Sequence, residues 1–454
     1  MTQSHKQDDK FIMMTTEPVE RLVCRLALPT IISMLITAFY NMADTYFVSK
    51  IGTSAAGAVG VVFSFMAIIQ ATGFLFGHGS GNYISRRLGA KKPEEAEEIA
   101  ATGFCSAFLM GILMAVIGLF LINPLVHFLG ATDTIAPYAI AYLKYILIGA
   151  PFMMSSLVLN NQLRFQGNAA YGMIGICTGA ALNIILDPLL IFTFHMGIAG
   201  ASIATSISQF ISMCILFILC NQKGIVKILF HKFHPSINNL TEILRGGLPS
   251  LFRQGIASIA TISLNQFAGA YGDAAIAAMS IVSRVGMFAG SALIGFGQGF
   301  QPVCGFNYGA KLYERVQRAF LFCCKVASVV LAVLAVLGFC YASQIISIFK
   351  TGDTTVTTIG MSALRWQCLT LPLMGIIILC NMMLQTIGKA LKASIVALAR
   401  QGLFFIPVLL LLAPTLGLLG IKIAQPISDL LAFMISIPLA VSELHEMNRK
   451  TEKK

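Results

Sequence analysis

Runs of apolar residues dominate this chain and restrict it to one class of fold. We identify twelve runs of about 20 mostly apolar residues, each long enough to cross a lipid bilayer as a helix. Only helices and closed barrels satisfy their own backbone hydrogen bonds in lipid, and runs of this length indicate helices. The predicted spans are about 25–48, 55–80, 99–122, 136–158, 170–192, 198–220, 246–270, 275–299, 318–341, 358–382, 393–414 and 417–441.

Charged residues are too few to cover a water-soluble surface. They make up 11% of the 454 residues, whereas soluble proteins contain about 25%. The net charge of +12 does not indicate a nucleic-acid partner, because the basic residues are not collected in one domain or on one face. They lie in the short connections between the apolar runs. We therefore predict an all-α integral membrane protein whose outer surface faces lipid.

The basic residues also predict the orientation of the chain in the membrane. Most of them lie in the N-terminus, the C-terminal tail and the connections that follow every second span, such as Arg86, Arg87, Lys91 and Lys92. Basic connections stay in the cytoplasm, so both termini are expected there. The polar N-terminus is not followed by a signal-peptide pattern, and we expect no cleaved leader. The expected location is the cell inner (plasma) membrane, with several crossings.

The second half of the sequence repeats the first at an offset of 220 residues, which slips by one near the middle and then returns. Leu28-Pro29 matches Leu248-Pro249, Gly77 and Gly79 match Gly297 and Gly299, and Gly89-Ala90-Lys91 matches Gly309-Ala310-Lys311. Six is an even number of spans, so both halves enter the membrane from the same side. They are parallel repeats, related by a pseudo-twofold axis along the membrane normal. Two lobes around a central cleft suit alternating access.

This repeat defines the expected organisation of the chain. Residues 1–20 are a cytoplasmic tail, 21–220 the N-lobe, 221–245 a basic cytoplasmic linker, 246–444 the C-lobe and 445–454 a second cytoplasmic tail. The 11 cysteines lie mostly within apolar runs and form no CxxC pair, so we expect buried thiols and neither a disulfide nor a sulfur metal site. We expect no organic cofactor, and a monomer.

Two spans of the first half each combine a carboxylate with an amide. Asn41 and Asp44 are three residues apart, and Asn183 and Asp187 are four apart, so each pair shares a helix face. An ionisable group in the membrane is disfavoured by roughly 2.5–3.5 kcal/mol and usually has a function. Two neighbouring buried carboxylates require a bound cation or a proton. Pro188 frees a backbone carbonyl near this pair and allows a kink. Each acid also has a purely structural interpretation. Asp44 could cap the end of its helix, and Asp187 could form a hydrogen bond to a neighbouring helix.

Other polar residues in the spans have simpler interpretations. Asp429 is expected to pair with an arginine of its own lobe, such as Arg284 or Arg253, and to hold helices together. These two arginines are interpreted as structural or as part of a substrate cleft. The stretch Gly77–Gly81 is expected to allow close helix packing. His78 within it is interpreted as a polar group at the cytoplasmic end of its helix rather than as a proton carrier.

The chain resembles the multidrug and toxic compound extrusion (MATE) family from about residue 20 to residue 444. The motifs that carry the resemblance are Leu28-Pro29, Asp44-Thr45-Tyr46-Phe47-Val48, Ile51-Gly52, Arg86-Arg87-Leu88-Gly89-Ala90, Gly167-Asn168, Asn183-x-x-x-Asp187-Pro188 and Gly197-x-x-Gly200-Ala201-x-x-Ala204-Thr205. The resemblance implies twelve helices in two lobes and export of drugs driven by inward sodium or proton flow. It also implies a cation site in the N-lobe at Asp44, Asn183, Asp187 and Thr205.

One branch of that family places acids on the seventh and tenth helices, and this sequence departs from that pattern. Its seventh span offers Gln254, Asn265 and Gln266, and its tenth span has no acid. The coupling site is therefore expected in the N-lobe.

The predicted function is export of cationic or amphipathic drugs by antiport with Na+ or H+, which would confer resistance to antibiotics. The alternative is a flippase for lipid-linked saccharides, whose cleft would need several cations for a pyrophosphate, and here only Arg253 and Arg284 are candidates. An intramembrane enzyme is disfavoured, because no nucleophile–base pair or metal-ligand set has a suitable spacing.

Overall fold

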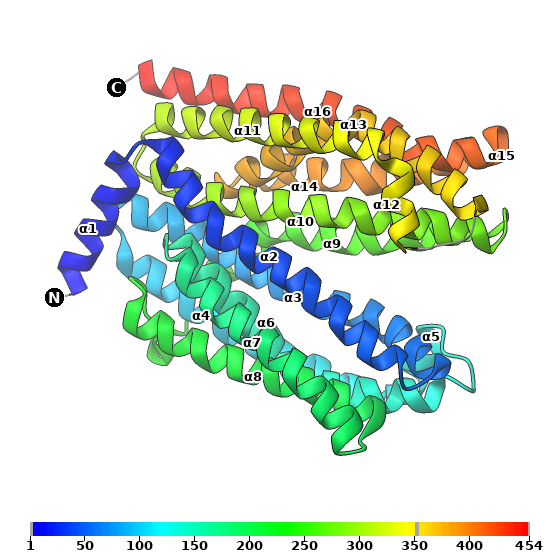
Figure 1. Cartoon of the computed structure of the whole chain (residues 1–454). Helices are drawn as coiled ribbons and strands as arrows, with labels where there is room; N and C mark the ends of the chain where they lie inside the picture. Colours follow the sequence, from blue (N-terminus) through cyan, green and yellow to red (C-terminus); the bar gives the residue numbers. More distant parts are fainter. Residues whose placement is uncertain (1–2, 350–353, 453–454) are drawn as a thin grey trace.

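The computed structural model describes residues 3–349 and 354–452, and every regular element in these ranges is helical. The long helices form two bundles, one for each half of the sequence, which lie side by side (Figure 1). The all-α, two-lobe membrane fold predicted from the apolar runs and the repeat is therefore confirmed.

The N-lobe contains six long helices. They are α2 (Val19–Ser49), α3 (Thr53–Gly89), α4 (Pro93–Phe120), α6 (Ala136–Phe165), α7 (Ala169–Pro188) and α8 (Gly197–Lys223). The short α5 (Ile122–Phe128) connects α4 to α6, and the π-helical turn η1 (Leu189–Thr193) follows α7. The helices α3 and α6 are packed along much of their length, and α2 packs on α7.

The C-lobe repeats this order. It contains α9 (Ile237–Gly269), α10 (Asp273–Gly309), α11 (Tyr313–Cys340), the short α12 (Ala342–Phe349), α13 (Thr354–Thr386), α14 (Ala390–Leu398), the π-helical turn η3 (Ala399–Leu403), α15 (Phe405–Leu416) and α16 (Leu418–Glu452). A connection that includes the 3-10 turn η2 (Phe230–Lys232) joins the two lobes. The segments α14, η3 and α15 together correspond to one predicted span.

Eleven helices of the described chain are long and apolar enough to cross a membrane. The twelfth predicted span, 246–270, lies within α9, which has 33 residues and runs alongside the others (Figure 1). The side chains of Arg253, Gln254, Asn265 and Gln266 make α9 less apolar than the eleven. This helix is therefore long enough to span, and its polar residues indicate that one of its faces is not in contact with lipid.

Glycines allow the two lobes to touch at two related places. A Cβ on Gly79 of α3 would lie 2.1 Å from the carbonyl oxygen of Ile243 in α9, and one on Gly299 of α10 would lie 2.4 Å from Cα of Ala27 in α2. Gly79 and Gly299 occupy equivalent positions in the repeat. The predicted role of the Gly77–Gly81 stretch in close helix packing is thus confirmed: Gly79 meets α9 of the other lobe, and Gly77 and Gly81 meet α6 of the same lobe.

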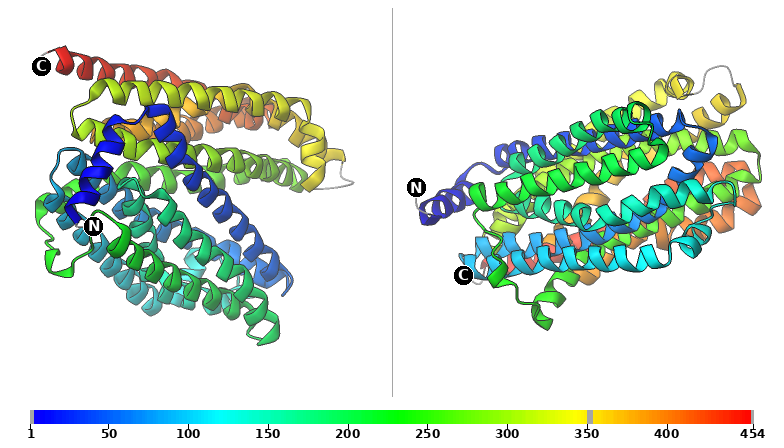
Figure 2. Two further views of the ribbon diagram at one scale, coloured as in Figure 1. Left: turned by 60° about the vertical axis from the view of Figure 1, so that its left-hand side comes forward. Right: turned by 90° about the horizontal axis from the view of Figure 1, so that it is seen from below.

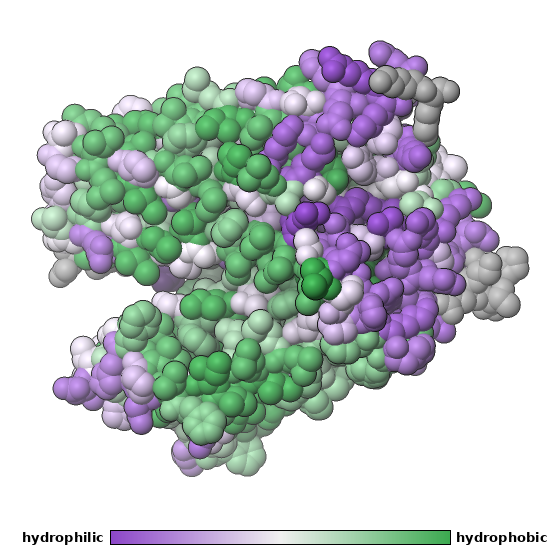
Figure 3. Space-filling view, turned by 180° about the vertical axis from the view of Figure 1, so that it is seen from behind, coloured by the Kyte–Doolittle hydropathy of each residue, from purple (hydrophilic) through white to green (hydrophobic). Residues whose placement is uncertain are grey.

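The lobes converge at the end where both termini lie and diverge toward the other end (Figures 1 and 2). The space-filling view shows the resulting cleft as a deep notch that opens away from the termini (Figure 3). Hydrophobic residues cover most of the sides of the visible face, and hydrophilic residues gather at the end opposite the notch. This distribution fits a molecule whose sides face lipid and whose cleft opens on one side of the membrane.

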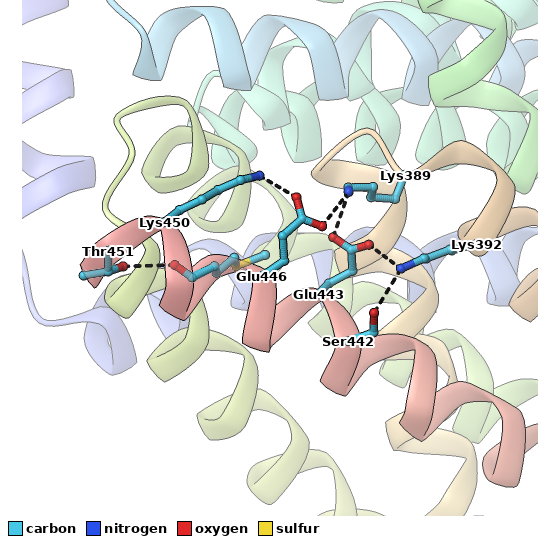
Figure 4. Close-up of polar contacts among 8 residues, drawn as sticks. Lys389, Lys392, Ser442, Glu443, Glu446, Lys450 and Thr451 are labelled. Atoms are coloured by element: carbon cyan, nitrogen blue, oxygen red, sulfur yellow. Dashed lines mark hydrogen bonds and ion pairs between the residues drawn. The ribbon is translucent and has the colours of Figure 1, made fainter. Parts of the chain in front are cut away.

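Both predicted tails contain helical residues. Residues 3–16 form the helix α1 (Gln3–Thr16), and the C-terminal residues continue α16 as far as Glu452. Ion pairs hold the end of α16 to the α13–α14 connection (Figure 4): Lys389 lies 3.2 Å from Glu443 and 2.9 Å from Glu446, and Lys392 lies 2.6 Å from Glu443. Burial opposes the charge of Lys389, but its hydrogen bonds to Glu446 and Glu443 outweigh burial and raise its pKa.

Candidate functional site

The α7–α8 hairpin brings three of the predicted site residues into direct contact. The amide nitrogen Nδ2 of Asn183 donates to Oδ1 of Asp187, at 3.4 Å, and to Oγ1 of Thr205, at 3.2 Å. All three side chains are buried. The spacing of four residues on α7 places the amide one turn from the carboxylate, and the short connection after η1 returns α8 alongside α7.

Asp44 reaches the same region from α2, which packs against α7. Its side chain is buried, and the hydroxyl of Tyr142 on α6 donates to its Oδ2 at 3.4 Å. Asp44 is close enough to Asp187 for the two charges to repel each other. The structure therefore gathers the four residues predicted for the cation site, from three helices of the N-lobe.

Several oxygen atoms of this cluster have no hydrogen-bond partner among the described residues. They are Oδ1 of Asp44, Oδ2 of Asp187, Oδ1 of Asn183 and Oγ of Ser208, which lies one turn beyond Thr205. Buried polar atoms are nearly always paired, and an unpaired carboxylate oxygen is especially unfavourable. Oxygen ligands of this kind suit a hard cation, and a proton on one carboxylate would also relieve the repulsion. The residues present fit either occupant.

Pro188 ends the regular part of α7, directly after Asp187. The next five residues, Leu189–Thr193, form the π-helical turn η1. Proline removes a backbone donor and frees an earlier carbonyl, and π-helical turns are frequent at functional sites. The irregular backbone expected beside Asp187 is present in the structure.

Asp429 is held by a different partner from those predicted. Its Oδ1 lies 2.7 Å from Nε of Arg400 in η3 and accepts from Nε2 of Gln425 at 2.8 Å. The arginine belongs to the same lobe, as expected, but it is neither Arg284 nor Arg253. Arg400 lies within the predicted span 393–414, and the sequence does not reveal that η3 carries its side chain toward α16. The contacts identify Asp429 as part of the lobe structure.

The remaining candidates are divided between the cleft and the surface. Arg253 is half-buried, and its Nη1 donates to Oδ1 of Asn381 on α13 at 3.4 Å. Arg284 is exposed on α10, and Asn41 is half-buried on α2, one turn before Asp44. Neither Arg253 nor Arg284 forms an ion pair with a described acidic residue.

His78 was assigned to the cytoplasmic end of its helix, and this position is wrong. The helix α3 continues as far as Gly89, and the imidazole is buried at the contact between the lobes. Its Nδ1 lies 2.9 Å from Oγ of Ser250 on α9, and its ring stacks on Phe74. The sequence misled because the apolar run ends near residue 80, whereas the buried polar helix does not.

Sequence reasoning also missed Tyr142 and Ser208. Tyr142 is completely buried within an apolar span, where its hydroxyl needs a hydrogen-bond partner. That requirement was the available signal, but it does not indicate which helix supplies the partner. Ser208 follows Thr205 by three residues, so the shared helix face could have identified it.

Comparison with known proteins gives one consistent result. The family model MatE matches the chain twice, over residues 29–189 and 249–411. The chain is similar to the protein named Multidrug export protein MepA from Staphylococcus saprophyticus, with 28% identity over 435 residues that cover 94% of this chain and 96% of the relative. The protein of the same name from Staphylococcus aureus (strain MRSA252) is 28% identical over 436 residues, with the same shares covered.

Solved structures agree with this. A structure described as MATE in complex with MaL6 superposes with a TM-score of 0.91 at 27% identity and covers 96% of this chain and 99% of its own. A structure described as the outward-facing conformation of a multidrug resistance MATE family transporter also has a TM-score of 0.91 at 27% identity, with 96% and 98% covered. The two matches to the family model begin at Pro29 and Pro249, which are equivalent positions in the repeat.

Proposed function

The chain belongs to the MATE family of membrane transporters, and from this premise we propose that it exports amphipathic or cationic drugs in exchange for inward-moving Na+ or H+. The observation that carries the proposal is the cluster of unpaired buried oxygens on Asp44, Asn183 and Asp187. A transporter coupled to a cation needs a buried negative site that is stable only when it is occupied. The names of the relatives, which describe multidrug export, support the substrate class.

The lobes provide the moving parts. They touch through glycines at their cytoplasmic halves and separate around the cleft at the other end. Both termini and most basic connections lie at the converging end, which we assign to the cytoplasm. The cleft then opens outward, and rocking of the two lobes would open the opposite end.

Coupling requires that the cation bind the two states unequally. Entry of Na+ or a proton would compensate Asp44 and Asp187 and remove the repulsion between α2 and α7. We infer that this occupied arrangement has a lower affinity for the drug, which leaves outward. The empty site, with two uncompensated carboxylates, would favour return of the lobes to the state that opens inward.

The test is efflux of a fluorescent cationic dye from proteoliposomes under an imposed sodium or proton gradient. Asp44→Asn and Asp187→Asn should each abolish gradient-driven efflux, and the gradient that drives the unmodified protein identifies the ion. Asp133→Asn makes the same chemical change at an exposed position between α5 and α6 and should leave efflux intact. Normal efflux in both site variants, with correct folding, would refute the coupling site.

A further inference from the structure

We propose that the inner end of the cleft binds the acidic group of the exported molecule, a carboxylate or a phosphate, with Arg253 as its main ligand and Ser250, Gln385 and His78 around it. The inference rests on the proposed transport function and specifies its substrate class. The proposed site at the inner end of the cleft is positively charged, whereas the Asp44–Asp187 cluster is negatively charged. Substrates would therefore include amphipathic molecules with an acidic group, alone or together with a cation.

The place is fixed by contacts between the lobes. Gly79 and Gly247 bring α3 and α9 into backbone contact. On α9, Ser250 lies one turn beyond Gly247 and bonds to His78 of α3, and Arg253 lies one further turn toward the open end. Arg253 therefore lies on α9 beyond the last of these contacts between the lobes, on the side toward which the lobes diverge.

Positive charge gathers here, and no carboxylate of the described residues forms an ion pair with it. Arg253 has one hydrogen bond, to the neutral amide of Asn381. Arg164 of α6 is 1% exposed, bonds to Oδ1 of Asn161 and lies over the ring of Phe165, but its Nε and Nη1 have no hydrogen-bond partner among the described residues. Arg164 is near enough to Arg253 to feel its charge, and His78 feels the charge of both arginines. A buried, unbalanced guanidinium is unfavourable and attracts an anion.

The neutral groups complete a set of donors. Nε2 of Gln385 donates to Oγ of Ser250 at 2.8 Å, and Oγ of Ser250 lies 2.9 Å from Nδ1 of His78, where either group can donate. We assign the Ser250 hydroxyl as the donor to Nδ1. That arrangement places the hydrogen of the imidazole on Nε2, which is buried and has no partner among the described residues. The imidazole thus adds an unused donor to the two guanidinium groups.

These donors match the chemistry of a carboxylate or phosphate. A guanidinium offers parallel N–H groups to two oxygens, and such charge-assisted bonds are roughly twice as strong as neutral ones. His78 and Arg164 belong to the N-lobe, whereas Ser250, Arg253 and Gln385 belong to the C-lobe. An acidic group bound between them would lose half of its ligands when the lobes rock apart, so this site would change affinity between the two states.

The experiment compares two dyes that differ in one group: a zwitterionic rhodamine with a free carboxylate, and its methyl ester, which is only cationic. Binding to the detergent-purified full-length protein is measured by fluorescence anisotropy, without any gradient. The unmodified protein should bind the acid more tightly than the ester by about tenfold or more, since hydrogen bonds to charged groups are worth about 1.5–3 kcal/mol. Arg253→Gln should reduce this preference to nearly none.

Two further variants keep the result interpretable. Arg253→Lys retains the charge and should retain part of the preference for the acidic dye. Arg284→Gln removes an exposed arginine of α10 and should retain the whole preference. A preference for the ester in the unmodified protein, or an equal ratio of affinities in Arg253→Gln, would overturn the proposal. A loss of the preference in Arg284→Gln as well would show only a general effect of charge and would also overturn it.

Competition distinguishes the sources of the acidic group. Inorganic phosphate and a short-chain phosphatidic acid are each used to displace the acidic dye. Displacement by phosphatidic acid alone would indicate a lipid headgroup, and displacement by both would indicate a free anion. Displacement by either compound should be weaker in Arg253→Gln than in the unmodified protein. Equal displacement in the two proteins would count against the site. Because binding is measured without a gradient, a failure of coupled efflux would refute the transport proposal and leave this site standing.

Discussion

In the C-lobe, the buried carboxylate of Asp429 lies 2.7 Å from the guanidinium of Arg400, whereas in the N-lobe Asp44 and Asp187 have only neutral hydrogen-bond partners among the described residues. Arg400 is a cation that the chain itself supplies. The N-lobe has the same need for a positive charge and no side chain to meet it. On the proposed function, a buried acid acts as a switch where its counter-charge can leave, and as a fixed part of the structure where it cannot.

The repeat shows how closely the two lobes are related at these sites. Thr205 and Gln425 occupy equivalent positions in the repeat, as do Gln209 and Asp429. Thr205 accepts from the amide of Asn183, and Gln425 donates to Asp429. The π-helical turns η1 and η3 follow α7 and α14, and η3 carries Arg400. Similar helices thus support a candidate cation site in one lobe and a closed ion pair in the other.

The largest expected effect comes from removing the C-lobe cation. Arg400→Met leaves Asp429 as an unpaired buried charge, which should lower the free energy of unfolding by about 3–5 kcal/mol. The double variant Arg400→Met with Asp429→Leu removes both charges and should recover most of that loss. Thermal unfolding in detergent measures both. A single variant as stable as the unmodified protein would mean that the pair is not the structural element described here.

The second prediction sharpens the contrast through ion dependence. A cation at about 100 times its dissociation constant stabilises the state that binds it by about 2.7 kcal/mol. Stability should therefore respond to Na+, at constant ionic strength, or to pH. Asp187→Asn should lose this response, and Asp429→Asn should keep it although the variant is less stable overall. A response that disappears in Asp429→Asn instead would place the cation in the C-lobe.

Much of the fold could be predicted because its determinants are local. Length and apolarity mark the spans, and the glycines and prolines that recur at a fixed offset mark the repeat. The helices of the two tails were missed, since α1 and the end of α16 are polar and are held by distant contacts such as those of Lys389 with Glu443 and Glu446.

In the candidate site, too, local features could be predicted and contacts between distant helices could not. The spacing of Asn183 and Asp187 is local and predicted their contact. The partners of Asp44 and Asp429, Tyr142 and Arg400, come from other helices at distances along the chain that no spacing rule indicates. For the same reason the sequence did not show that Arg164, Arg253 and His78 meet.

The third prediction compares two hydrogen-bonding groups at equivalent positions. Thr205→Val removes the hydroxyl that accepts from Asn183, and Gln425→Leu removes the amide that donates to Asp429. Each bond is worth about 1 kcal/mol. We expect Thr205→Val to weaken the apparent affinity for the coupling ion about fivefold, and Gln425→Leu to reduce stability without changing that affinity. Ion titrations of efflux check the first, and thermal unfolding checks the second. Equal effects of the two variants on ion affinity would remove the distinction between the lobes.

The smallest expected effect lies at the end of the molecule where the termini lie, because the N-terminal segment contacts the two lobes through different groups. On the N-lobe side, Nζ of Lys10 donates to the carbonyl oxygen of Gly167 at 2.7 Å and to Oδ1 of Asn168 at 3.0 Å. On the C-lobe side, Asn307 donates to the carbonyl oxygen of Met14 at 3.0 Å, and Arg315 donates to that of Glu17 at 2.6 Å. One attachment depends on an amine that titrates, and the other does not.

Burial, together with the nearby charge of Arg25, lowers the pKa of Lys10 to about 8, although Glu17 opposes the shift. This pKa lies below 10.5, the value of the undocked amine. Docking of the protonated amine is therefore disfavoured, and this free-energy penalty is complete below about pH 8. The penalty decreases as the pH rises from about 8 toward 10.5. The contact of α1 with the N-lobe should therefore strengthen with rising pH. The anisotropy of a fluorophore on the N-terminus should increase over this range in the unmodified protein and stay constant in Lys10→Gln, which keeps an amide donor. The same increase in both proteins would show that another group controls the docking of α1.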